Sequence, residues 1–148
     1  LIGRGIAGLY ARDAVGVAGR AQAEALFAPT GATLWVAREA DLDAVTALSG
    51  SGPAYVFYVL EAMMQAAVEM GLSPEQGRSL AQATFDGGTA LAMASPLSPA
   101  TLRAQVTSQG GTTHAAISSL EAAGVKAAFV KALSAARQRA VELGDEFG

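Results

Sequence analysis

One stretch of seven residues is the most informative in this chain about the binding of a small polar ligand. It runs from Thr107 to Thr113 with the sequence TSQGGTT, and a helical pattern begins at its end. The glycines permit a tight turn, and the backbone amides of Gly111, Thr112 and Thr113 at the start of the helix would suit a carboxylate or a phosphate. The hydroxyl groups of Ser108, Thr112 and Thr113 can donate or accept hydrogen bonds. A polar, glycine-rich helix cap without a ligand is the ordinary alternative, and the spacing leaves both interpretations open.

A second stretch of small residues, SGSGPA, runs from Ser49 to Ala54. Its composition predicts a Gly/Ser loop that leads into a helix beginning at Gly52 and Pro53, because proline is favoured in a first helical turn. Such a loop exposes several amide groups and can face an anion or another polar ligand. An ordinary helix cap is again the alternative.

The pattern G-x-G-x-x-G occurs at Gly3–Gly8. As a dinucleotide fingerprint it would need a strand before it, a helix after it and an acidic residue about 20 positions later at a strand end. Here only two residues precede the pattern, residues 9–11 continue it as strand, and Glu24 falls inside a predicted helix. We therefore interpret it as a strand whose small residues lie against a neighbouring element.

The composition excludes several classes of protein. The 148 residues, 51% hydrophobic and 16% charged, are typical of one compact domain or of one domain plus part of another. With 10 Lys and Arg against 13 Asp and Glu, no basic stripe is available for nucleic acid. The absence of Cys and the single His argue against disulfides and against a metal site. No apolar run approaches the ~20 residues of a membrane span, so we expect a soluble, cytoplasmic protein without a membrane partner.

The pattern of elements changes near residue 40. Before it, strand-like segments at 1–10 and 33–36 flank a helical segment at 18–28, which is the β-α-β order of the last portion of an α/β domain. After it every periodic segment is helical. We therefore expect two parts, residues 1–40 and residues 41–148. Because the chain opens with Leu1 inside an apolar run, we also expect a fragment whose upstream part is missing.

The helical part is predicted from start signals and apolar spacing. Ser73 and Ser98 each precede a proline, which is the cap-plus-proline signature of a helix start. The abundant Ala and Gly suit helices that pack closely or interleave between two subunits. We expect the methionines Met63, Met64 and Met70 in the core. We expect a solvated helix face near the end of the chain. The predicted helices are 52–70, 74–94, 99–105, 113–121 and 125–143, and the solvated face comprises Arg137, Arg139, Glu142, Asp145 and Glu146.

Two of these stretches are specific enough to carry a resemblance. The segment Ala44–Tyr55 (AVTALSGSGPAY) and the segment Val106–Thr113 (VTSQGGTT), followed by Leu120-Glu121, resemble pyrroline-5-carboxylate reductases. The opening residues 1–11 are similar to the later part of the cofactor domain of that family. The resemblance implies a mainly α fold: a helical dimerisation domain of the 6-phosphogluconate dehydrogenase C-terminal type, preceded by the β-α-β tail of a Rossmann domain.

The resemblance also implies an activity and a set of site residues. The family reduces 1-pyrroline-5-carboxylate to L-proline, with hydride from NADPH or NADH, in the last step of proline biosynthesis. It implies that Thr113 is catalytic, through a hydrogen bond to the ring nitrogen. Its implied partners are a small imino acid and a second subunit whose helices interleave with these, with dimers gathering into a larger ring. The implied substrate-binding residues are Ser108, Gly111, Thr112 and Thr113; the implied cofactor-binding residues are Glu39, Ser49, Gly50, Ser51, Gly52 and Gln105; no metal is implied.

Two positions depart from the family pattern. Gln109 stands where the family usually has proline, and Pro96 stands near a position where some members carry an acidic side chain. A fragment of such a reductase is expected to be inactive alone. Two other interpretations stay open: a helical dimerisation module without catalysis, and a related dehydrogenase acting on another small imino or keto acid.

Overall fold

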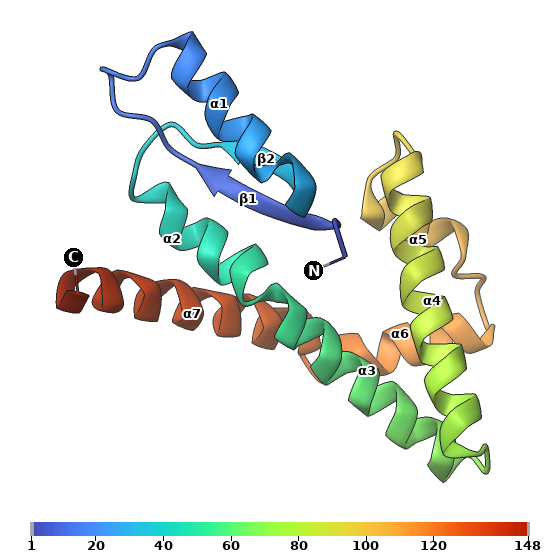
Figure 1. The fold of residues 1–148 in the computed structure, drawn as a ribbon. Helices are drawn as coiled ribbons and strands as arrows, with labels where there is room; N and C mark the ends of the chain where they lie inside the picture. The colour runs from blue at the N-terminus through green and yellow to red at the C-terminus, as the bar shows by residue number, and fades with distance from the viewer. Residues whose placement is uncertain (1, 148) are drawn as a thin grey trace. The chain divides into compact units, whose positions relative to one another are not determined.

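The first element of the fold is a small parallel sheet with a helix beside it. The computed structural model describes residues 2–147, and in it β1 (Gly5–Leu9) pairs with β2 (Gly31–Trp35) from Gly5 opposite Gly31 to Leu9 opposite Trp35 (Figure 1). Helix α1 (Val17–Phe27) and a 3-10 turn, η1 (Ala28–Thr30), connect the strands. The β-α-β order expected before residue 40 is therefore confirmed.

The G-x-G-x-x-G pattern lies in and just before strand β1, and helix α1 begins only at Val17. Helix α2 (Asp41–Val45) packs on this strand so closely that a Cβ at Gly8 would lie 2.7 Å from a methyl group of Val45. Glycine is needed here because a neighbouring side chain fills the space. The interpretation of the pattern as a strand against a neighbour is confirmed.

All later elements in the described part of the chain are helical, as predicted. The Ser73 hydroxyl accepts a hydrogen bond from the Gln76 amide, and the Gln76 side chain accepts one from the Ser73 amide, which completes a capping box. The Ser98 hydroxyl likewise accepts from the Thr101 amide. The elements are α2, a π-helical turn η2 (Thr46–Gly50), α3 (Gly52–Glu69), α4 (Pro74–Ala94), α5 (Pro99–Gln105), α6 (Thr112–Ala122) and α7 (Val125–Phe147).

The chain divides by its internal contacts into two compact units, and each is described by itself. One comprises residues 2–53 with 130–147, and the other comprises residues 54–129. These units are defined by contacts, and the expected sequence boundary near residue 40 stays a prediction.

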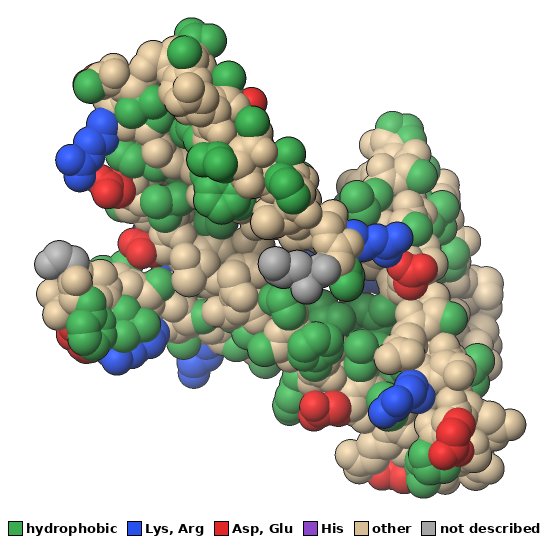
Figure 2. Space-filling model, in the orientation of Figure 1, with side chains coloured by type: hydrophobic (Ala, Val, Ile, Leu, Met, Phe, Trp, Pro, Cys, Tyr) green, Lys and Arg blue, Asp and Glu red, His purple; other side chains and the backbone are tan. Residues whose placement is uncertain are grey.

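Very little apolar surface is buried within the described chain. Its buried hydrophobic residues are the three alanines Ala47, Ala67 and Ala81. Large side chains stay exposed, among them Phe57 at 60%, Met70 at 75% and Met93 at 84%. Figure 2 shows apolar side chains spread over the visible face, with charged side chains scattered among them. The expectation that Met70 lies in the core is wrong, because none of the described elements covers its side chain just after α3.

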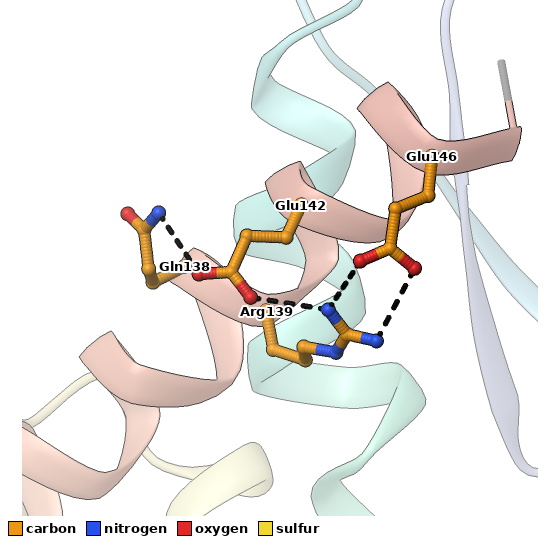
Figure 3. Close-up of polar contacts among 4 residues, drawn as sticks. All are labelled: Gln138, Arg139, Glu142 and Glu146. Atoms are coloured by element: carbon orange, nitrogen blue, oxygen red, sulfur yellow. Dashed lines mark hydrogen bonds and ion pairs between the residues drawn. The ribbon is translucent and has the colours of Figure 1, made fainter.

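The solvated face expected near the end of the chain is confirmed by an ion-pair cluster on α7. Arg139 donates to Glu142 at 3.2 Å and to Glu146 at 2.8 Å, and Gln138 donates to Glu142 at 3.3 Å (Figure 3). These side chains stay about half exposed, so each contact stabilises the helix by only a few tenths of a kcal/mol. In the part of the chain that is described, no helix is both long and apolar enough to cross a membrane.

Candidate functional site

The loop of residues 106–111, between α5 and α6, holds two of the four substrate-binding residues predicted from the sequence, Ser108 and Gly111, and the other two begin α6. Gly110 has a φ of +76°, a conformation that glycine adopts without strain, and it turns the chain toward α6. The Gly111 amide donates to the Ser108 carbonyl at 3.1 Å, which closes this turn. The Thr107 hydroxyl donates to the Arg103 carbonyl at 2.6 Å and fixes the start of the loop to the end of α5.

Helix α6 begins with free amide groups. Its N-cap is Gly111, which has no side chain to accept a hydrogen bond from them. The first bond of the helical ladder runs from the Ala115 amide to the Gly111 carbonyl at 3.1 Å. The amides of Thr112, Thr113 and His114 therefore precede the ladder and have no intrahelical acceptor. An anion at this end would be favoured by these donors and by the helix dipole.

Hydroxyl groups surround this helix start. Ser108 lies so close that a Cβ on Gly111 would be 2.7 Å from its Oγ. Thr112 is exposed and Thr113 is half-buried, each in the first turn of α6. The fold thus brings together the four predicted substrate-binding residues within one turn and one helix start. This arrangement can hold a carboxylate by amide and hydroxyl donors, without a charged side chain.

The stretch Ser49–Gly52 has a different structure from the one predicted. Ser49 and Gly50 belong to the π-helical turn η2, and helix α3 follows almost directly. The Ser51 amide donates to the Thr46 carbonyl at 2.9 Å, and the Ser49 hydroxyl donates to the Val45 carbonyl at 3.0 Å. The predicted open loop is therefore wrong, because these groups are used inside the α2–η2–α3 segment and not presented as a row of free donors.

The remaining predicted cofactor residues are exposed. Glu39 lies between β2 and α2, where its carbonyl accepts from the Leu42 amide at 3.0 Å. Gln105 is the last residue of α5. Glu39 and Ser49–Gly52 belong to one unit, and Gln105 belongs to the same unit as the α6 start.

The described residues do not form a cradle for the phosphates of a dinucleotide. The one glycine pattern of the right spacing is strand, and the Ser49 and Ser51 groups are paired within the helix. A Cβ on Gly52 would meet nothing within 4 Å, so a flat group has room to approach the backbone there.

Sequence reasoning missed two side-chain contacts. Trp35 donates its indole N–H to Glu24 at 2.6 Å while the Arg20 guanidinium stacks over the ring at 4.6 Å from its centre, and this joins α1 to β2. Arg103 of α5 pairs with Glu121 of α6 at 3.2 Å, across the 106–111 loop. Neither contact has a helical spacing in the sequence, so no local pattern indicates it.

A profile of the family described as pyrroline-5-carboxylate reductase dimerisation matches residues 39–143. The pyrroline-5-carboxylate reductase of Pseudomonas aeruginosa is 45% identical over 148 residues, which are all of this chain and 54% of that protein. This chain belongs to the pyrroline-5-carboxylate reductase family. The family predicted from the two sequence motifs is thus confirmed, and the chain spans about half the length of the curated relatives it matches.

Solved structures of reductases agree with the fold. The pyrroline-5-carboxylate reductase of Coxiella burnetii superposes with a TM-score of 0.89 at 40% identity, over 93% of this chain and 51% of that chain. The Plasmodium falciparum pyrroline carboxylate reductase, solved with NADP bound, gives a TM-score of 0.85 at 28% identity, over 93% of this chain and 57% of that one. The mainly α fold with a short β-α-β segment is therefore confirmed as that of the reductase family.

Proposed function

We propose that this chain supplies the substrate-binding and dimerisation part of a pyrroline-5-carboxylate reductase, which reduces 1-pyrroline-5-carboxylate to L-proline. The observation that carries the proposal is the start of α6, where amides without an intrahelical acceptor stand among the hydroxyls of Ser108, Thr112 and Thr113. The carboxylate of the imino acid is the anion that this site would hold. No charged side chain is needed, because several short hydrogen bonds to an ionised acceptor bind strongly together.

Thr113 is proposed to act at the imine nitrogen. It is half-buried in the first turn of α6, among the amides that would hold the carboxylate, so a ring whose carboxylate sits at the helix start would bring its nitrogen near the Thr113 hydroxyl. A hydrogen bond there holds the ring in orientation and assists protonation as the nitrogen becomes an amine.

The reaction takes its hydride from NADPH or NADH when the cofactor is bound. We propose that Ser49–Gly52, Glu39 and Gln105 contact the nicotinamide end of that cofactor, with the open backbone at Gly52 as the closest approach. The cytoplasm is proposed as its location. Because the described residues offer no diphosphate cradle, we expect the chain alone to show no NADPH-dependent turnover.

Dimerisation is the second part of the proposal. The exposed apolar side chains on α3, α4 and α7, such as Phe57, Met93 and Phe147, would be covered if helices of two chains interleave. A larger ring of such dimers would form through surface that the dimer interface leaves exposed. Light scattering should give twice the chain mass, and a well-folded monomer at micromolar concentration would contradict the proposal.

The test of the substrate site is a calorimetric titration with L-proline, the reaction product. We expect saturable binding by the dimer, and weaker binding by Thr113→Ala because the contact to the ring nitrogen is lost. Ser118→Ala is the matched control, since it removes an exposed hydroxyl from the same helix away from its start. If a well-folded dimer does not bind proline, or if Thr113→Ala binds as the parent does, the proposed site is wrong and the dimerisation module without catalysis is favoured.

A further inference from the structure

Helix α6 makes an ion pair with α5 at its far end. Glu121 lies in the last turn of α6, and its Oε1 is 3.2 Å from Nη1 of Arg103 on α5. An acidic side chain in the last turn opposes the helix dipole, so Glu121 is unfavourable for α6 taken by itself. Its favourable partner is the guanidinium of the neighbouring helix.

Arg103 contacts both the loop and the helix that follows it. Its carbonyl accepts from the Thr107 hydroxyl at the start of the loop, and its side chain binds Glu121 on the helix that follows. The two attachments lie on either side of the Gly110 turn. One residue of α5 therefore connects the entrance of the loop to the distal end of α6.

A small shift at the Arg103–Glu121 contact corresponds to a tilt of α6, because the contact lies far from the start of the helix. Glu121 lies nine residues after Thr112, which at 1.5 Å per residue is about 13 Å along the helix. A sideways shift of about 1 Å at Glu121 therefore corresponds to a tilt of about 4° at the α6 start. A groove of about 380 Å³, lined by Ile117, Leu120 and Phe129, opens beside the ion pair. Packing therefore does not hold the C-terminal end of α6 on the side of this groove.

We infer that Arg103 and Glu121 are positioning residues, whose ion pair sets the direction in which the first amides of α6 and the Thr113 hydroxyl point. This inference rests on the proposed substrate site, because the direction of the first α6 amides matters for function only when they bind a carboxylate. The pair is about half exposed, so it adds little to the stability of the fold. Its effect is on the alignment of donors with a bound ligand.

The test compares proline binding by the parent dimer, Arg103→Gln, Glu121→Gln and the charge exchange Arg103→Glu with Glu121→Arg. We expect the dissociation constant for proline to rise about three- to fivefold in each single variant and to recover in the exchange. Arg139→Gln is the matched control, because Arg139 is equally exposed and pairs with two glutamates on α7. Its dissociation constant for proline should match that of the parent.

A second measurement follows the helix without ligand. Residual dipolar couplings of the amides in 99–105 and 112–122 should fit one alignment in the parent, and the couplings of α6 should shrink in both single variants. Unchanged couplings, unchanged proline binding in the single variants, or a charge exchange that does not restore binding would each overturn the inference. Absence of proline binding by the parent would instead refute the proposed substrate site, and the positioning role with it.

Discussion

Replacing Gly111 by alanine offers a direct test of the α6 start. Its backbone angles, φ −81° and ψ 172°, are extended and suit any residue, so the substitution adds no backbone strain. The new Cβ would lie 2.7 Å from Oγ of Ser108 and 3.2 Å from the Ser108 carbonyl oxygen. Ordinary contacts of this kind begin at 3.4 Å. The Ser108 hydroxyl must therefore rotate to another rotamer, away from the helix start.

The size of the effect follows from the hydrogen bond that is lost. A hydrogen bond to a charged group contributes about 1.5–3 kcal/mol. If the Ser108 hydroxyl binds the carboxylate, Gly111→Ala should weaken proline binding about ten- to hundredfold. The α6 ladder begins at the Ala115 amide and stays intact, so the melting temperature should fall only slightly, by the cost of alanine in place of glycine at the N-cap.

The assay is a double-mutant cycle by calorimetry on the parent, Gly111→Ala, Ser108→Ala and the double variant. Ser108→Ala removes the atom that meets the new methyl group, so the double variant should bind no more weakly than Ser108→Ala alone. Gly144→Ala is the control for the glycine substitution itself, because a Cβ there meets nothing within 4 Å. Additive losses would refute the steric argument, and parental affinity in Gly111→Ala would refute a role for the Ser108 hydroxyl.

Three further predictions concern the scaffold. Gly77→Ala should destabilise the chain by about 1–3 kcal/mol in urea unfolding, since its Cβ would lie 2.9 Å from Cβ of Ala67; a neutral effect would show that α3 and α4 separate easily. Ser73→Ala should cost about 1 kcal/mol by the same assay, through loss of the α4 cap. Hydrogen bonding from Arg38 lowers the pKa of Asp41 below its ordinary value of 3.8, so this contact stabilises the fold fully above about pH 4 and is lost as the pH falls through the lower folded pKa. Arg38→Gln should raise the pKa of Asp41 in a carbon-detected NMR titration, and an unchanged pKa would contradict the assignment.

The helical part of the fold was predictable because its signals are local. Pro74 and Pro99, each after a capping serine, fix the starts of α4 and α5 within a few residues of sequence. The α6 start was equally visible, since two glycines followed by threonines are typical of a turn and a helix cap. The predicted substrate-binding residues are therefore contiguous in structure as they are in sequence.

The Ser49–Gly52 stretch shows where local signals fail. Serine and glycine are typical of loops, and this composition predicts an open one. The backbone instead closes a wider helical turn, from the Ser51 amide to the Thr46 carbonyl, between two helices that already hold its ends. The composition of this segment indicates that each of its residues favours a loop. It does not indicate how the helices on either side constrain the backbone of the segment.

What the sequence by itself determined is the family, the order of elements and the donor groups present at the start of α6, because each depends on neighbouring residues. Tertiary structure alone decided which apolar faces stay uncovered, as at Met70, and which distant side chains meet. The contacts of Trp35 with Glu24 and of Arg103 with Glu121 join residues 11 and 18 positions apart. They exist only because a turn brings two elements side by side, and no periodicity in the sequence encodes that distance.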